Sequence, residues 1–215
     1  MEVSSKNRWS LMLSLAEEKD ARMLGYANIA GIDEVGRGPL AGPVLAAAVI
    51  MPERIKRWEW VDRIRDSKLL SPLQRDGLYE HIKETAIGFG IGMMSSQTID
   101  FRGIAKATRL AMKQAVEECN PYPEFLLIDY VILPEVKLPQ KGVVEGDSIC
   151  FSIACASILA KVTRDRIMVE MDGIYPGYGF AEHKGYGTKE HLECLQRLGP
   201  CPIHRSSFQP VREVM

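Results

Sequence analysis

The spacing of apolar residues along the chain predicts a domain built from both strands and helices. Short runs of almost wholly apolar residues indicate buried strands, and four occur, at residues 28–33, 43–51, 87–94 and 125–130. Apolar residues at helical spacing predict five helices, at residues 8–26, 71–85, 97–119, 147–171 and 188–198. Early strands followed by alternating helices and strands predict an α/β chain, with helices on the faces of a mixed sheet.

Local signals set some of the element ends. Ser71 followed by Pro72 matches a helix N-cap with proline at the first helical position. Asp147 and Ser148 are expected to cap the helix that begins there. The segment 175–187 is rich in glycine, tyrosine and histidine, and it is predicted to be an ordered loop.

The composition is that of a globular protein. The chain has 215 residues, with 27 basic and 28 acidic side chains, and 46% of its residues are apolar. These values exclude a disordered or collagen-like chain. Because the charges nearly balance, a nucleic acid could be held only by local basic patches and not by bulk positive charge.

The cysteines and the apolar runs indicate the cellular compartment of the protein. The five cysteines are an odd number and form no Cys-x-x-Cys pair, which argues against a disulfide framework and a zinc knuckle. The N-terminus lacks the pattern of a signal peptide, and the longest apolar run, residues 149–160, is too short to span a bilayer. We therefore expect a soluble, cytoplasmic protein with no membrane partner, and nothing in the sequence demands more than a monomer.

Two adjacent acids, Asp33 and Glu34, stand where the first apolar strand ends. A buried carboxylate is costly unless it is paired or binds a metal ion. Neighbours on a strand face opposite ways, so both can serve one site only if the chain bends at once, and the glycines at 36 and 38 allow that bend. Arg37 between them offers a guanidinium group suited to phosphate. Taken alone, the same residues also suit a surface turn.

The string GIDEVGRGPLAGPV, residues 31–44, resembles the opening motif of the type 2 ribonucleases H, the bacterial ribonuclease HII family. Further blocks of that family follow in order, and the resemblance extends from about residue 25 to residue 212. These blocks are DSK at 66–68, LID at 127–129, EGDS at 145–148, SIACASILAKVTRDR at 152–166, HKGYGTKEH at 183–191 and PIHRSSF at 202–208.

The resemblance implies a ribonuclease H-like fold and an endoribonuclease. It implies one catalytic domain at residues 25–215 with a small helical C-terminal part, preceded by an accessory helix at residues 1–24. The expected substrates are RNA–DNA hybrids and duplex DNA that contains single ribonucleotides, cut on the 5′ side of the ribonucleotide. The expected products carry 5′-phosphate and 3′-OH ends, and the expected role is the removal of misincorporated ribonucleotides and RNA primers.

The resemblance also implies four acids that hold two Mg²⁺ or Mn²⁺ ions: Asp33, Glu34, Asp129 and Asp147. Carboxylate oxygens suit these hard cations, and two ions can stabilise both the attacking and the leaving oxygen of a phosphodiester. Asp165 competes for the fourth position. On a single helix it would lie about 27 Å from Asp147, so the two could not share one site. Asp165 is instead expected to form surface ion pairs with Arg164 and Arg166.

Substrate contacts are implied for a second set of residues. The backbone of Gly36, Arg37 and Gly38 is expected around the 2′-hydroxyl of the ribose, since a protein tells RNA from DNA by contact with that group. Tyr186 is expected against the sugar on its 3′ side. Phosphate contacts are expected from four further residues: Ser67, Lys68, His183 and Lys184.

The chain departs from the family pattern at four positions, of which three remove or replace a usual cation. These are Leu69, Glu145 and Ile149, while Tyr130 replaces a residue that is often small. Three other functions fit parts of the sequence. They are a DNA nuclease of the same fold, a hybrid-binding module without catalysis, and a glycoside hydrolase, although adjacent acids do not easily straddle a sugar bond.

Overall fold

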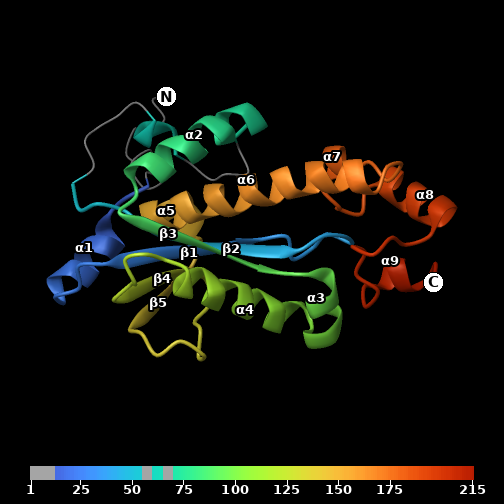
Figure 1. Cartoon of the computed structure of the whole chain (residues 1–215). Coiled ribbons are helices and arrows are strands. Elements are labelled where there is room, and N and C mark those ends of the chain that lie inside the picture. The colour runs from blue at the N-terminus through green and yellow to red at the C-terminus, as the bar shows by residue number, and fades with distance from the viewer. Residues whose placement is uncertain (1–12, 55–59, 65–69) are drawn as a thin grey trace, which may run out of the picture.

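The computed structural model describes residues 13–54, 60–64 and 70–215 (Figure 1). Within them the strands form one five-stranded sheet in the order β3-β2-β1-β4-β5. β1 (Ile29–Val35), β2 (Val44–Ile50) and β3 (Gly88–Met94) are antiparallel, and β4 (Phe125–Asp129) and β5 (Gln140–Val143) run parallel to β1. Figure 1 shows α2 (Pro72–Thr85) and α6 (Phe151–Ile174) over one face and α4 (Ile104–Glu117) over the other. The mixed sheet with flanking helices confirms the predicted fold class.

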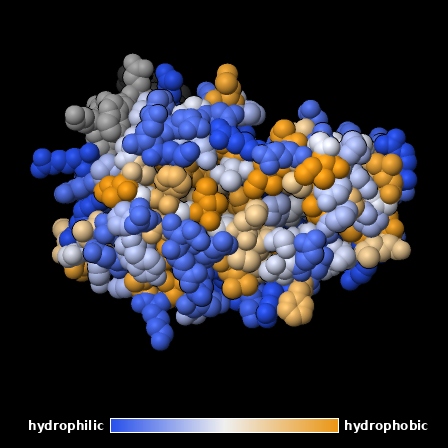
Figure 2. All heavy atoms as spheres, in the orientation of Figure 1, coloured by the Kyte–Doolittle hydropathy of each residue, from blue (hydrophilic) through white to orange (hydrophobic). Residues whose placement is uncertain are grey.

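Every side chain of β2 is buried because both faces of this strand are covered. Ala47 and Val49 pack in the apolar cluster with α2 and α6, whereas Ala46 and Ala48 pack in the cluster with α4. This alternation is the two-residue period of a strand, and it explains why the segment consists almost wholly of apolar residues. Figure 2 shows hydrophilic side chains over the outer surfaces of α2 and α4, with hydrophobic ones interspersed.

Two predicted helices are each divided in the structure. The helix predicted at 97–119 is α3 (Ser96–Arg102) followed by α4, because Gly103 between them has a φ of 77°. The helix predicted at 147–171 is the single turn α5 (Gly146–Ile149) followed by α6. Cys150 separates them in an extended conformation, in a parallel bridge with Ser14 near the N-terminus. That contact comes from the fold and leaves no signal in the local sequence.

The N-terminal helix α1 (Ala16–Met23) covers part of the predicted helix at 8–26, of which residues 8–12 lie outside the described residues. Glu18 of α1 is buried, and its carboxylate accepts hydrogen bonds from the Ser152 N–H (2.9 Å) and the Cys150 thiol (3.4 Å). A carboxylate is favourable at the N-terminus of a helix, so Glu18 caps α6 from another element. The predicted division between an accessory helix at 1–24 and a catalytic domain stays a proposal.

The remaining elements are short. The predicted cap of α2 is confirmed. The Ser71 side chain accepts a hydrogen bond from the Gln74 N–H, and the Gln74 side chain accepts one from the Ser71 N–H. The loop predicted at 175–187 contains one helical turn, α7 (Phe180–His183). With α8 (Lys189–Leu198) and α9 (Gln209–Arg212) it forms the small helical end of the molecule seen at the right of Figure 1. A short 3-10 helix, η2, spans Val61–Arg63. Among the described residues, no helix is both long and apolar enough to cross a membrane.

Candidate active site

Two of the four predicted acids stand side by side at one end of the sheet. β1 and β4 are parallel neighbours, and Ile32 pairs with Ile128, so Asp33 and Asp129 come next in register. Both acids therefore lie at the carboxyl ends of adjacent parallel strands. All four predicted acids, Asp33, Glu34, Asp129 and Asp147, line one cleft of about 550 Å³.

Asp147 reaches the cleft through a sharp turn after β5. Glu145 has a left-handed backbone, with φ 53°, and the Gly146 N–H donates to Asp129 Oδ1 (2.8 Å). A Cβ atom on Gly146 would lie 2.6 Å from Ile153 Cδ1 and 3.2 Å from Asp129 Oδ1, so a larger residue would push these side chains aside. The glycine before Asp147 thus lets α5 approach Asp129 closely, and the two acids face one cleft from different elements.

Burial and nearby negative charge disfavour ionisation of Asp33 and Glu34. Burial raises the pKa of Asp33 to about 8, with a further rise from the negative charges of Glu34 and Asp129 and an opposing hydrogen bond from Ser157. Burial also raises the pKa of Glu34, and the guanidinium of Arg37, 3.2 Å from its Oε1, opposes that rise. Carboxylates that repel one another in a shared cleft would be stabilised in the charged form by a bound cation.

The acids are gathered but do not form a finished ligand cage. Among the described residues, no three acidic, histidine or cysteine side chains are close enough together to hold a metal ion as they stand. Asp129 Oδ1 accepts its bond from Gly146, and Asp33 Oδ1 accepts one from the Glu34 N–H (2.8 Å). Binding of an ion by this set therefore requires some side chains to rotate.

The same cleft is also lined by Gly36, Arg37, Gly38 and Tyr186. Gly36 has a φ of 89°, and a Cβ atom there would lie 2.3 Å from Arg164 Nε, so only glycine fits. Tyr186 is 41% exposed, and the guanidinium carbon of Arg164 lies 5.8 Å from its ring centre. The structure brings together the turn and the tyrosine that the sequence analysis assigned to the ribose.

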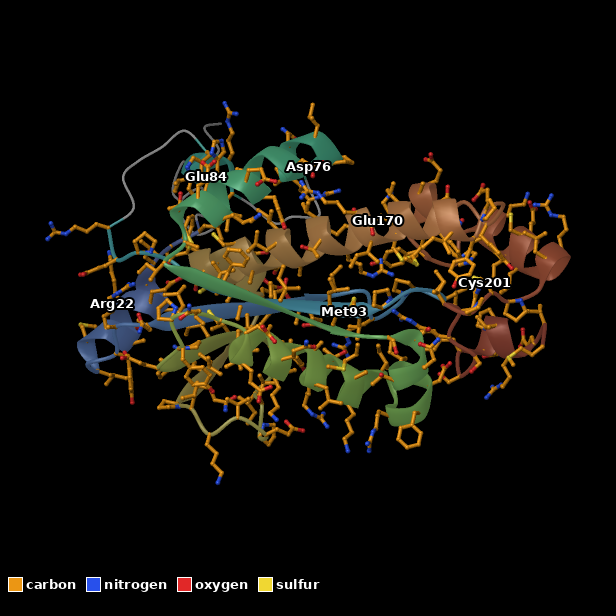
Figure 3. The ribbon with its side chains drawn as sticks, in the orientation of Figure 1. Arg22, Asp76, Glu84, Met93, Glu170 and Cys201 are labelled. Carbon is orange, nitrogen blue, oxygen red and sulfur yellow. The ribbon has the colours of Figure 1, made fainter. Side chains whose placement is uncertain are left out.

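A chain of buried hydrogen bonds fixes the backbone at Tyr186. Its carbonyl accepts from His191 Nδ1 (2.9 Å), and Nε2 of His191 lies 3.0 Å from Nε2 of His204. The Cys201 N–H donates to Nδ1 of His204 (3.0 Å). Cys201, labelled in Figure 3, lies at the end of the molecule where the small helices gather. These bonds connect the Tyr186 loop to α8 and to the turn before Arg205.

His183 and Lys184 are not among the residues that line the cleft. Nε2 of His183 donates to the Tyr178 carbonyl (2.7 Å), and its Nδ1 accepts from the Gly185 N–H (3.1 Å). Lys184 Nζ donates to the Ala181 carbonyl. Because both ring nitrogens are bound to the backbone, His183 shapes the turn before Tyr186, and its phosphate contact stays a prediction. Ser67 and Lys68, like Leu69, lie outside the described residues.

Three cleft residues were missed by the sequence analysis: Arg75, Ser157 and Lys161. Ser157 and Lys161 are four residues apart on α6 and so share a face, which is the signal that could have found them. Lys161 Nζ pairs with Asp165 Oδ1 (2.8 Å). The expected partners of Asp165 were therefore wrong.

The two arginines that flank Asp165 have other roles. Arg164 is fully buried beneath the glycine turn. Arg166 pairs across to α2, with Asp76 (3.1 Å) and Glu80 (3.3 Å), and Figure 3 labels Asp76 on that helix. Neighbours on a helix point about 100° apart, so residues 164 and 166 meet different surroundings from Asp165.

Comparison with known proteins identifies relatives over nearly the whole chain. The ribonuclease HII family model matches residues 30–211. Ribonuclease HII of Dehalococcoides mccartyi (strain ATCC BAA-2266 / KCTC 15142 / 195) is 57% identical over 199 residues, which are 93% of this chain and 94% of the relative.

Two solved structures share the fold. Ribonuclease H2 of Pyrococcus horikoshii OT3 has a TM-score of 0.72 at 24% identity, over 87% of this chain and 96% of that one. Bst ribonuclease HIII in complex with Mn²⁺ has a TM-score of 0.63 at 18% identity, over 90% of this chain and 71% of that one.

Proposed function

Because this chain belongs to the ribonuclease HII family and is an endoribonuclease that acts on RNA–DNA hybrids, we propose that it also cuts duplex DNA on the 5′ side of a single embedded ribonucleotide. The observation that carries the proposal is one cleft that is lined both by the four acids and by the glycine turn with Tyr186. Removal of misincorporated ribonucleotides and of RNA primers is the role that this activity would serve.

The cofactor in this proposal is a pair of divalent ions, Mg²⁺ or Mn²⁺, held by Asp33, Glu34, Asp129 and Asp147. The acidic oxygens of this set suit hard cations, and the pKa of Asp33 is raised by burial and by the charges of Glu34 and Asp129, an effect that a bound cation would oppose. When bound, such ions would stabilise the negative charge on the attacking and leaving oxygens of the phosphodiester. The Mn²⁺ in Bst ribonuclease HIII, a protein of the same fold, supports this choice.

The glycine turn and Tyr186 supply recognition of the ribose and of the next sugar. The backbone N–H groups of the turn at residues 36–38 are suited to the ribose 2′-hydroxyl, and the exposed face of Tyr186 is suited to the next sugar. Arg75 and Lys161 place positive charge at the cleft for the phosphates. Lys184, Ser67 and Lys68 stay predicted phosphate contacts. Water attacks the phosphorus in line and the 3′ oxygen leaves, so the products should carry 5′-phosphate and 3′-OH ends.

We further propose that the protein is a cytoplasmic monomer. The five cysteines are all unpaired in the structure, and three of them are buried, which suits a reducing compartment. The four departures from the family pattern leave all four acids in place, so we expect them to change the affinity for the substrate backbone and not the chemistry.

The test is a cleavage assay on two DNA duplexes that differ only in one ribose, with Mg²⁺, Mn²⁺ or EDTA. We expect a single cut on the 5′ side of the ribonucleotide, no cut in the all-DNA duplex, and no product with EDTA. Equal cutting of both duplexes would identify a DNA nuclease and overturn the proposal. Binding without product in Mg²⁺ or Mn²⁺ would identify a hybrid-binding module without catalysis.

A further inference from the structure

Arg205 lies directly beneath the glycine turn, and none of its surface is exposed. Its guanidinium donates to the main-chain oxygens of Gly36 (2.6 Å) and Arg37 (3.0 Å). It also donates to those of Gly42 (2.9 and 3.0 Å) and Pro43 (3.3 Å). One side chain from the C-terminal part of the protein thus holds both ends of the turn between β1 and β2.

Among the described residues no carboxylate is hydrogen-bonded to the Arg205 guanidinium, although the charge of Asp100 favours its charged form, and a cation buried in this way is costly. Burial, with the nearby charge of Arg164, lowers the pKa of Arg205 to about 9, yet the group remains a cation at neutral pH. All the hydrogen-bond partners of its guanidinium are carbonyl oxygens, whose dipoles offset the charge. An apolar side chain could fill the same volume but could not orient carbonyl groups. The geometry that Arg205 imposes on the turn is therefore its distinguishing effect.

That geometry determines where two N–H groups of the turn point. The carbonyl of Gly36 and the N–H of Arg37 belong to one planar trans peptide, so they point in opposite directions. The same holds for the carbonyl of Arg37 and the N–H of Gly38. Since both carbonyls point to the buried guanidinium, both N–H groups point away from it, on the side of the cleft that this turn lines. In the part of the chain that the structure describes, neither N–H donates to a protein acceptor.

We propose that Arg205 is a positioning residue for ribose recognition, which holds the N–H groups of Arg37 and Gly38 toward the 2′-hydroxyl of the substrate. The inference rests on the proposed function and adds to it the side chain that sets the direction of the turn. A guanidinium bound to a carbonyl also polarises its peptide group, which makes the N–H on the other side a better donor.

Arg164, which lies beneath the same turn, provides a matched comparison. It is equally buried, and it donates to the main-chain oxygens of Pro43 (3.0 Å), Ala41 (3.2 Å) and Lys184 (3.0 Å). Its guanidinium holds the far end of the turn but makes no bond to the Gly36 or Arg37 carbonyls. Arg164 and Arg205 should therefore both support the fold, while Arg205 alone directs the two N–H groups.

The test measures binding in the Asp129→Asn background, which does not cut the substrate. Dissociation constants are compared for a duplex with one ribonucleotide and for the same duplex in DNA alone. We expect Arg205→Lys to lower the preference for the ribonucleotide about tenfold, the size of effect that lost hydrogen bonds to one hydroxyl give. Affinity for the all-DNA duplex should stay within about twofold. Arg212→Lys, an exposed control seven residues further on, should change neither value.

The other outcomes would overturn either the proposal for Arg205 or the proposed function. An unchanged preference in a folded Arg205→Lys variant overturns the proposal, and so does an equal loss of affinity for both duplexes, which would indicate a structural role only. Arg164→Lys should reduce the preference less than Arg205→Lys, and a larger loss would also overturn it. If Asp129→Asn with Arg205 intact shows no preference for the ribonucleotide, the proposed function fails before Arg205 is tested.

A second measurement covers the case in which Arg205→Lys does not fold. In Asp129→Asn with Arg205 intact, nuclear magnetic resonance follows the guanidinium protons of Arg205 and the N–H groups of Arg37 and Gly38. We expect slow exchange of the guanidinium protons, and N–H shifts that respond more to the ribonucleotide duplex than to the all-DNA duplex. Guanidinium exchange as fast as that of Arg212, or equal responses of the N–H groups to the two duplexes, would overturn the proposal.

Discussion

Two regions beside the cleft bury charge of opposite sign and compensate for it in different ways. We call them the acidic wall, made of Asp33, Glu34, Asp129 and Asp147, and the arginine wall, which is the glycine turn with Arg164 and Arg205 beneath it. On the acidic wall, Asp33 and Asp147 are less than a tenth exposed, and burial with mutual repulsion raises the pKa of Asp33 to about 8. On the arginine wall, burial lowers the pKa of Arg164 to about 10 and that of Arg205, where Arg164 adds to the effect, to about 9. Carbonyl oxygens of the protein itself surround both arginines. The charges of the two arginines are therefore compensated within the fold, whereas the acidic wall is where we propose that divalent ions bind.

The largest expected effect follows from breaking the acidic wall. Asp129→Asn removes one charge and keeps the shape, and the amide oxygen of the substituted side chain can still accept the bond from Gly146. We expect cleavage to fall by about 10³-fold or more, because metal-dependent charge stabilisation is worth several kcal/mol. Single-turnover assays on a duplex with one ribonucleotide measure the loss.

The loss of activity in Asp129→Asn should not be accompanied by a loss of stability. Without divalent ions, Asp129→Asn relieves repulsion with Asp33 and Glu34, so the free energy of unfolding should stay unchanged or rise. Undiminished turnover, or loss of activity explained by unfolding, would contradict the assignment of Asp129.

The arginine wall should show the reverse pattern, with a large effect on stability. Arg164→Met leaves the carbonyls of Ala41 and Lys184 without this donor and leaves Pro43 only its bond from Arg205, and we expect a loss of about 3 kcal/mol or more. Arg166→Met, two residues further along α6, removes exposed ion pairs and should cost about 1 kcal/mol or less. Urea unfolding of the two variants measures the difference. Equal losses in the free energy of unfolding would show that the buried hydrogen bonds of Arg164 stabilise the fold no more than the exposed ion pairs of Arg166 do.

These walls also differ in how far the sequence could predict them. The acids were found because a carboxylate at the end of an apolar strand is unusual, and the resemblance to the ribonuclease HII family, which the comparisons confirm, supplied Asp129 and Asp147. Arg164 and Arg205 gave no such signal, since arginine in a sequence usually indicates an exposed position. Arg205 is bonded to Gly36, 169 positions away, and such a contact exists only in the folded chain.

The same distinction applies to the secondary structure. β1 to β4 were predicted within one or two residues, because their apolar runs reflect burial, which is complete on both faces of β2 and partial in the edge strand β3. β5 was missed because Gln140–Val143 is half polar, and its pairing with β4 alone makes it a strand. The break between α5 and α6 was missed because it depends on the contact of Cys150 with Ser14.

Adding a divalent ion should stabilise the protein through the acidic wall alone. At about 100 times the dissociation constant, Mg²⁺ or Mn²⁺ should add about 2.7 kcal/mol and raise the melting temperature by about 5–10 °C. Asp147→Asn should reduce this rise, and Arg164→Met should keep it, since that side chain does not face the acids. Thermal unfolding at constant ionic strength measures the rise. An equal rise in Asp147→Asn would show that the ion binds elsewhere.

The last comparison of the two walls is a pair of opposite slopes in stability against pH, measured by urea unfolding in EDTA. The pKa of Asp33 is raised to about 8, so the folded state binds its proton more tightly than the unfolded state does, and this stability is lost as pH rises from about 4 to about 8. Asp33→Asn should therefore flatten the loss toward pH 8. A slope that survives in this variant would place the titrating group elsewhere.

The opposite slope comes from the histidine pair that holds the Tyr186 carbonyl, where burial and the charge of His191 lower the pKa of His204 from 6.5 to about 4. The carbonyl of Tyr186 can only accept, so His191 carries its proton on Nδ1 and its Nε2 accepts from His204. A proton on His204 would enter at Nδ1, where the Cys201 N–H already donates. Stability from this neutral pair is full above pH 6.5 and is lost as pH falls toward 4, by about 2–3 kcal/mol. His204→Gln should flatten this acid loss, and the exposed control His81→Gln should keep it, so an unchanged slope in His204→Gln would contradict the neutral pair.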